Sequence, residues 1–347
     1  MDLHRHLEGA LRVETLFELH QARRQRLHPS LRVLRRRLVV PPGERPGFAA
    51  FLERFNHLRF CYGGPGAIER LAREAVADAA ADGVVHLELR FSPVFAARRQ
   101  HDTLAPALSR EHPPAPEEVE ASAQAVVRAA RDEAALHGIS VAFIVCLNRS
   151  GGTELNRPAV ELLNRPVGAA LAGLDVAGDE SVPLSEVGEL IALGRAAGRK
   201  ITLHAGEDPR GDGAARVREA AEVWGADRIG HGVRVAEHKP TAEWLRQRGV
   251  PLEICLTSNV QTRAAASFAA HPLGPLLRAG LRVTLNTDDP AISGTTLSEE
   301  YARAHEQAGL NRTELARLAL NGAQAAFLPD GERRALARRI EAAWRDW

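Results

Sequence analysis

The chain of 347 residues is 45% hydrophobic and 26% charged, the composition of an ordinary soluble globular domain. Lys and Arg number 45 against 44 Asp and Glu, so the net charge of +1 provides no global field that would attract nucleic acid or an anionic membrane. The 3 cysteines show no CxxC spacing, and the sequence has neither an apolar run of about 18 residues nor a signal peptide. We therefore expect a cytoplasmic protein with a small-molecule partner, whereas the sequence predicts no oligomeric state.

Eight short apolar runs, several of which end in polar residues, predict the strands. In chain order they cover 2–6, 84–92, 139–147, 171–178, 200–206, 228–232, 251–258 and 281–288. Helical periodicity occupies 66–82, 116–137, 184–198, 212–224, 240–248 and 271–279 between them. Strands that alternate with helices pair in parallel, and eight of them close a barrel. The sequence predicts an α/β fold, a (β/α)8 TIM barrel, in which residues 1–347 form a single domain with the active site at the carboxyl ends of the strands.

The connection between the first two predicted strands is anomalous. It is about 75 residues long, more than one helix and two turns require. We expect a helical insertion after the first strand, over about residues 12–80, in which two or three helices cap the barrel mouth. Its Arg-rich stretch at 23–37 is interpreted as a solvated helical face rather than a nucleic-acid patch, because the net charge is nearly zero.

The first predicted strand carries two histidines, His4 and His6. Side chains alternate along a strand with period two, so both histidines face the same side and are able to bind one metal ion. Alone, this pattern is a weak signal, because polar residues at a strand end are common. The stretch is also short at its front, so we expect either a brief first strand or a start upstream of Met1.

Further polar residues follow three other predicted strands. His204 ends the fifth strand and is followed by Glu207, while Asp288 and Asp289 end the eighth. His231, between glycines, ends the sixth and is either a residue that orients or deprotonates a water, another nitrogen ligand or a turn histidine. Adjacent aspartates repel each other unless their roles differ, so one is expected to bind metal and the other substrate. Such nitrogen and carboxylate ligands suit zinc, which activates water for hydrolysis, although iron, manganese and cobalt accept the same ligands.

The order of several motifs resembles the adenosine deaminase family of purine deaminases, within the amidohydrolase superfamily. These motifs are "LHRHLEGAL" (3–11), "ELRFSP" (88–93), "DVAGDE" (175–180), "HAGE" (204–207), "RIGHG" (228–232), "TSN" (257–259) and "NTDDP" (286–290). The resemblance implies zinc-dependent hydrolytic deamination of a 6-aminopurine nucleoside, most simply adenosine or 2′-deoxyadenosine.

The resemblance also implies a role for each site residue. One zinc ion would be bound by His4, His6, His204 and Asp288, and His6 would also contact substrate. Glu207 would protonate purine N1, and His231 would orient the attacking water and help to deprotonate it. The remaining substrate contacts would be Asp289 at N7, the backbone N–H of Gly178 at N3, and Glu8 near the sugar.

The glutamate at position 8 does not decide which 6-aminopurine is the substrate. Adenosine deaminases commonly have Asp at this position, and adenine deaminases resemble this sequence there, so the alternatives are adenine, an N6-substituted adenine and 6-aminodeoxyfutalosine. A two-metal amidase or phosphotriesterase is disfavoured, because "LDVAGDE" has no lysine that would bridge two metals. A barrel that holds metal without catalysis is disfavoured too, because Glu207, His231 and Asp289 provide groups that a structural site does not need.

Overall fold

The computed structural model describes residues 1–22, 28–58, 65–97 and 113–345. Eight strands form one parallel sheet in which each strand pairs with the next along the chain. They are β1 (Asp2–His6), β2 (His86–Phe91), β3 (Ser140–Asn148), β4 (Leu171–Ala177), β5 (Lys200–Ala205), β6 (Arg228–His231), β7 (Leu252–Ile254) and β8 (Val283–Leu285). The predicted TIM barrel is therefore confirmed.

The sheet closes where the chain beyond β8 returns to β1. Arg5 and Asp288 form a parallel bridge, in which the Asp288 N–H donates to the His4 carbonyl at 2.7 Å and the His6 N–H donates to the Asp288 carbonyl at 2.9 Å. This closure joins two segments separated by 283 positions, as measured from Arg5 to Asp288. It places two histidines and one aspartate of the predicted site side by side.

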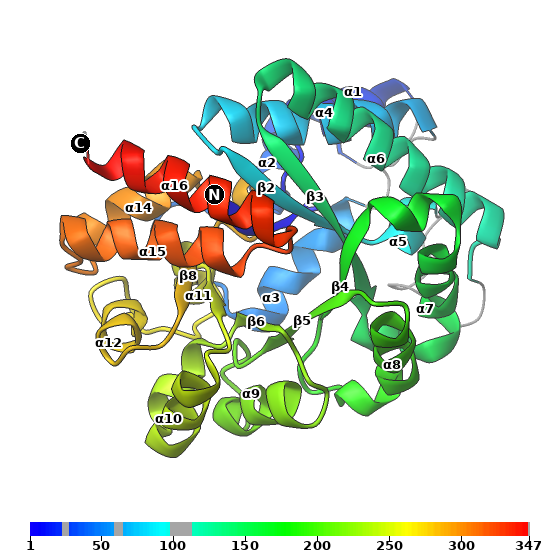
Figure 1. Ribbon diagram of the computed structural model, residues 1–347. Helices are drawn as coiled ribbons and strands as arrows, with labels where there is room; N and C mark the ends of the chain where they lie inside the picture. Colours follow the sequence, from blue (N-terminus) through cyan, green and yellow to red (C-terminus); the bar gives the residue numbers. More distant parts are fainter. Residues whose placement is uncertain (23–27, 59–64, 98–112, 346–347) are drawn as a thin grey trace.

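Helices surround the barrel (Figure 1). They are α1 (Val13–Ala22), α2 (Leu31–Leu38), α3 (Phe48–Glu53), α4 (Pro65–Ala81), α5 (Pro93–Ala97), α6 (Pro116–His137), α7 (Gly152–Glu161), α8 (Gly188–Ala196), α9 (Gly213–Glu222), α10 (Lys239–Arg248), α11 (Leu256–Gln261), α12 (Leu273–Arg278), α13 (Pro290–Ser293), α14 (Leu297–Glu306), α15 (Arg312–Ala325) and α16 (Asp330–Arg345). In the part of the chain that the structure describes, no helix is both long and apolar enough to cross a membrane.

The long connection after β1 contains α1, α2, α3, the 3₁₀ helix η1 (Arg54–His57) and α4. Ser30 caps α2 by accepting from the Val33 N–H, and the three consecutive arginines of α2, residues 35–37, are exposed as expected of a solvated face. The helix α4 packs against α6 outside the barrel, whereas α3 lies across the middle of the ring in Figure 1. Residues 23–27 and 59–64 of the predicted insertion lie outside the described residues.

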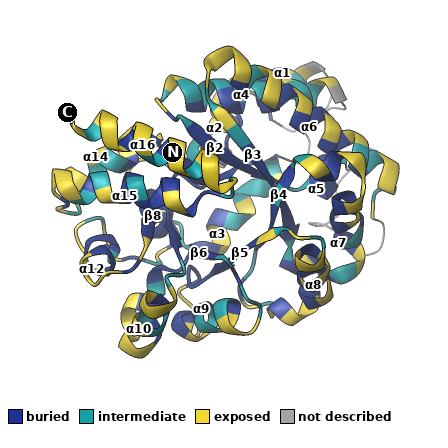
Figure 2. Ribbon diagram, in the orientation of Figure 1, coloured by how far each residue is buried: buried dark blue, intermediate teal, exposed yellow. Residues whose placement is uncertain are grey.

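The interior of the barrel is polar, although the strands themselves are buried (Figure 2). In β2, His86, Glu88 and Arg90 alternate with Leu87, Leu89 and Phe91. The apolar set joins the hydrophobic core, and the charged set contacts residues of other strands: Glu88 pairs with Arg228, and Arg90 with Asp175 and Glu253. Because every one of these charges is fully or almost fully buried, each one requires its partner.

Two predicted strands are too long at their carboxyl ends. The prediction over 251–258 is wrong beyond Ile254, because the chain turns at Cys255 and α11 begins at Leu256. The prediction over 281–288 is likewise wrong beyond Leu285. In both cases the residues after the strand turn toward the barrel mouth, where their side chains make contacts that an extended strand would not allow.

Candidate active site

The carboxyl ends of the strands surround a cavity of about 510 Å³. Residues of α3 and η1 form one of its walls. Cavities of this volume are typical of small-molecule sites. All but one of the residues that the sequence predicts for the site line it: His6, Glu8, Gly178, His204, Glu207, His231, Asp288 and Asp289. His4 lies directly behind this surface, with Nε2 at 3.3 Å from Asp288 Oδ1. The structure thus brings all the predicted site residues together.

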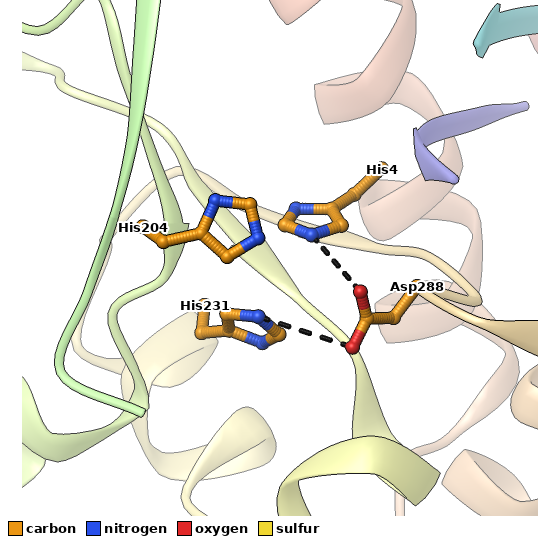
Figure 3. Close-up of side chains that lie close together, drawn as sticks. All are labelled: His4, His204, His231 and Asp288. Atoms are coloured by element: carbon orange, nitrogen blue, oxygen red, sulfur yellow. Dashed lines mark ion pairs between the residues drawn. The ribbon is translucent and has the colours of Figure 1, made fainter. Parts of the chain in front are cut away.

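Four buried side chains converge at the floor of the cavity (Figure 3). His4 comes from β1, His204 from β5, His231 from β6 and Asp288 from the turn after β8. One potential ligand atom of each lies within 4.8 Å of the others. Asp288 accommodates two of the histidines, since its Oδ2 lies 3.9 Å from His231 Nε2 while its Oδ1 faces His4.

His6 approaches the same cluster from β1. Its Nε2 lies 3.2 Å from His204 Nε2 and 3.5 Å from Asp288 Oδ1. Two imidazole nitrogens that face each other as lone pairs repel, whereas a cation between them binds both. His4 Nε2 is buried without a hydrogen-bond partner among the described residues, which also fits a ligand atom. This set of nitrogen and carboxylate donors fits a zinc ion.

The outer nitrogens of two histidines are held by carboxylates. His4 Nδ1 donates to Glu253 Oε2 at 2.8 Å, and His204 Nδ1 donates to Asp175 Oδ1 at 3.0 Å. Arg90 donates to both of these carboxylates at 2.9 Å and so holds them in place. Because the proton stays on Nδ1, Nε2 keeps its lone pair, which is the arrangement that a metal-binding histidine requires.

Two site residues have a left-handed backbone conformation, which is uncommon outside glycine. His231 has φ of 59° and Asp288 has φ of 62°. His231 is the last residue of β6 and Asp288 lies three residues after β8, so at each position the unusual backbone turns the chain out of the strand direction beside the cavity. Such strain is characteristic of functional sites.

Glu207 is positioned by a second carboxylate. The N–H groups of Gly206 and Glu207 both donate to Glu180 at 2.8 Å, which fixes the turn after β5. Ser258 Oγ donates to Glu207 Oε1 at 3.3 Å. Burial, and then the charges of Asp288 and Glu180, raise the pKa of Glu207 well above its ordinary value, so the side chain is a carboxylic acid able to give up a proton.

The pKa values of the adjacent aspartates, Asp288 and Asp289, are shifted in opposite directions. Burial opposes ionisation of Asp288, but the close approach of His4 and of the other nearby histidines holds its pKa well below the ordinary value. Burial, and then the charge of Asp288, raise the pKa of Asp289 well above it. The surroundings thus favour the anion at Asp288, which is suited to a cation, and the protonated form at Asp289, which is able to donate a hydrogen bond. Gly9 leaves room for Asp289, because a Cβ at Gly9 would lie 1.8 Å from Asp289 Oδ1.

Glu8 and Gly178 lie on the cavity wall. Glu8 Oε1 accepts from the Ser92 N–H at 2.8 Å, and burial raises the pKa of Glu8 to about 7. Gly178 follows β4 with φ of 103°, a conformation that residues with a side chain rarely adopt. A Cβ there would also lie 3.2 Å from Asn148 Oδ1. Glycine therefore leaves the backbone of this wall open to a ligand.

Comparison with known proteins assigns the family. The adenosine deaminase family model matches residues 1–343. An adenosine deaminase of Salmonella heidelberg is 34% identical over 346 residues, which covers 99% of this chain and 97% of that protein. The chain belongs to the adenosine deaminase family. It is therefore an aminohydrolase that acts on a purine small molecule, as the sequence motifs implied.

Solved structures of this fold have related activities. The crystal structure of an adenine deaminase from Arthrobacter aurescens is 26% identical, with a TM-score of 0.85 and coverage of 99% of this chain and 98% of that one. An Arabidopsis N6-mAMP deaminase is similar in fold, with 24% identity, a TM-score of 0.81 and coverage of 99% and 97%. Membership of the family therefore leaves the particular 6-aminopurine to be argued from the cavity.

Several residues of this family site were not singled out from the sequence. Asp175, Asn259 and Arg90 lie in the motifs "DVAGDE", "TSN" and "ELRFSP", whereas Glu253 and His271 lie outside the seven motifs. The available signal was alternation with period two, because Arg90 in β2 and Glu253 in β7 are charged residues that alternate with apolar ones. A buried charge in such a position needs a partner, but the partner's identity depends on the neighbouring strands.

Proposed function

We propose that the protein hydrolyses adenosine and 2′-deoxyadenosine to inosine and 2′-deoxyinosine, releasing ammonia. The proposed residues are His4, His6, His204 and Asp288 for one zinc ion, Glu207 and His231 for catalysis, and His6, Glu8, Gly178 and Asp289 for substrate. The observation that carries the proposal is the position of the buried Glu207 carboxyl, which lines the cavity beside the histidine cluster, with Oε2 at 3.3 Å from His231 Nε2.

The choice of metal ligands is supported by the hydrogen bonds behind them. His4 and His204 have carboxylates at Nδ1 and so present Nε2 as a lone pair, and His6 Nε2 faces that of His204. Asp288 supplies the anionic oxygen. When bound, zinc is a Lewis acid that lowers the pKa of a water from about 15.7 to about 7 and so makes it nucleophilic.

Glu207 supplies the proton that the purine needs. Protonation of N1 makes C6 electrophilic, so attack by water at C6 requires an acid within hydrogen-bond reach of N1. The raised pKa of Glu207 favours the protonated form, which is able to supply this proton. His231 Nε2, at 3.3 Å from Glu207 Oε2, lies between this acid and the ligand cluster, and there it would orient the attacking water.

The purine is oriented by donors that match its acceptors. N7 of a purine accepts hydrogen bonds, and the raised pKa of Asp289 makes its carboxyl a donor. Asp289 Oδ1 is buried and has no partner among the described residues, so it is available to a ligand. The open backbone at Gly178 would donate its N–H to N3, which is also an acceptor.

The polarity of the cavity supports an uncharged substituent on the purine. None of the described residues that line the cavity is Lys or Arg, whereas Glu8, Glu53 and Asp179 are acidic. A phosphate monoester would meet repulsion there without a compensating cation. The carboxyl of Glu8, held by the Ser92 N–H, is instead suited to a sugar hydroxyl. These features favour a nucleoside over a nucleotide such as N6-methyl-AMP.

Adenine is the second candidate substrate. Glu8 favours adenine, because adenine deaminases resemble this sequence at that position. The similar structure from Arthrobacter aurescens is also described as an adenine deaminase. Against adenine, the cavity of about 510 Å³ is lined by η1 residues Phe55 and Asn56 in addition to the proposed purine contacts at Asp289 and Gly178. That space would hold a sugar and would remain filled with water around a free base.

A substrate panel tests the proposal. Purified protein with measured zinc content is assayed for ammonia release with adenosine, 2′-deoxyadenosine, adenine, N6-methyl-AMP and 6-aminodeoxyfutalosine. The Glu207→Gln variant, purified in parallel, controls for contaminating deaminase. We expect the highest kcat/KM with the two nucleosides. A higher kcat/KM with any other compound, or no ammonia from any of them, contradicts the proposal.

A further inference from the structure

A row of hydrogen bonds leads from the backbone of α12 to His231. The Leu273 N–H donates to His271 Nδ1 at 3.0 Å. His271 Nε2 lies 3.4 Å from Asn259 Oδ1, and Asn259 Nδ2 lies 3.1 Å from His231 Nδ1. All three side chains are at most 3% exposed, so these polar atoms depend on one another for partners.

The backbone sets the direction of the whole row. An amide N–H only donates, so His271 Nδ1 accepts and the proton of this ring is on Nε2. His271 Nε2–H then donates to Asn259 Oδ1, which places the Asn259 amide nitrogen toward His231. That nitrogen donates to His231 Nδ1. The single proton of the His231 ring is therefore on Nε2, the atom that faces the cavity.

The reversed arrangement is unfavourable. If His231 Nδ1 carried the proton, Asn259 would have to turn its oxygen toward His231 and its NH₂ toward His271. His271 would then need a lone pair at Nε2 and a proton at Nδ1, which would face the Leu273 N–H. Two donors would meet in a buried place without an acceptor, and a buried hydrogen bond would be lost.

We propose that Asn259 and His271 are positioning residues that fix His231 as the Nε2–H tautomer, so that His231 donates a hydrogen bond into the site. The consequence for catalysis rests on the proposed function, because it assigns His231 to the reacting water. The family resemblance implies that His231 both orients the attacking water and helps to deprotonate it. The Nε2–H tautomer is suited to the orienting role. It has no lone pair at Nε2 with which to take the first proton from water.

The same cluster thus contains histidines of opposite tautomer. His4 and His204 donate from Nδ1 to carboxylates and present a lone pair at Nε2. His231 accepts at Nδ1 from an amide and presents N–H at Nε2. The difference in outer partner separates the ligand histidines from His231, although the ligand atoms of all three lie within 4.8 Å of one another.

NMR of the zinc-loaded protein labelled with ¹⁵N-histidine tests the tautomer directly, with the His231 signals assigned by the His231→Gln variant. We expect the wild-type ring to carry its proton on Nε2. The Asn259→Asp variant presents only acceptors to His231, so its proton should move to Nδ1 and kcat should fall about 10²- to 10⁴-fold with an unchanged KM and zinc content. The His271→Phe variant frees Asn259 to rotate and should give a mixture of tautomers.

Asn321→Asp is the matched control, because Asn321 is a buried asparagine on α15 that donates to the Val283 carbonyl at 2.8 Å. It should change neither the tautomer nor kcat. A proton on His231 Nδ1 in the wild type overturns the proposal, as does an unchanged tautomer in both the Asn259 and His271 variants. Since NMR reports the tautomer and ammonia release reports the proposed function, failure of either is distinguished from failure of the other.

Discussion

Replacing Glu207 with Gln separates proton supply from every other function of this side chain. Glutamine has nearly the same volume, and its amide oxygen is still able to accept from Ser258 Oγ, which lies 3.3 Å from Glu207 Oε1. Because burial raises the pKa of Glu207 and so favours the uncharged acid, a neutral amide suits the same surroundings. What is lost is the transferable proton alone.

The expected loss follows from that change. General acid catalysis by a positioned side chain contributes about 10²- to 10⁴-fold in rate, or about 2.7–5.4 kcal/mol of activation free energy. We expect kcat for ammonia release from adenosine to fall by this factor with KM little changed. The Glu207→Asp variant keeps the acid but withdraws it by one methylene, and a misplacement of about 1 Å costs about 10²-fold.

Three measurements on the Glu207→Gln variant decide the matter: the rate of ammonia release, the metal content and the thermal midpoint of unfolding. Metal content and unfolding midpoint should match the wild type, because Glu207 is not among the proposed ligands. A wild-type rate would refute the role of Glu207 as the acid. Loss of metal together with activity would show instead that Glu207 supports the metal.

Three further outcomes are expected. Activity should fall as pH rises through the raised pKa of Glu207, since the protonated form is the active one, and a kcat/KM that rises over that range would contradict this assignment. Asp175→Asn removes the anionic acceptor from His204 Nδ1 and should weaken zinc affinity about 10- to 100-fold, measured by competition with a chelator; unchanged affinity would refute it. Gly9→Ala places a Cβ against Asp289 and should lower kcat/KM for adenosine about 10²-fold while zinc content stays constant, whereas a wild-type kcat/KM would show that Asp289 tolerates displacement.

The barrel could be predicted because its signals are local. Each predicted run of apolar residues became a strand, and Gly138 and Gly249 end α6 and α10 in the left-handed conformation near where the helical pattern stops. The errors are at the carboxyl ends of β7 and β8. There the chain leaves the strand so that Asn259 reaches His231 and Asp288 reaches His4, and no local pattern specifies such contacts.

The sequence by itself determined the order of elements and the family, and it indicated the residues proposed for ligand and acid chemistry, because residue type and spacing along one strand or turn are properties of neighbouring positions. Only the tertiary structure decided which nitrogen each histidine presents. That choice depends on Glu253, Asp175 and Asn259, which contact His4, His204 and His231 from other elements. The metal-binding and proton-handling roles proposed for the three histidines therefore differ through partners that lie 28 to 249 positions away along the chain.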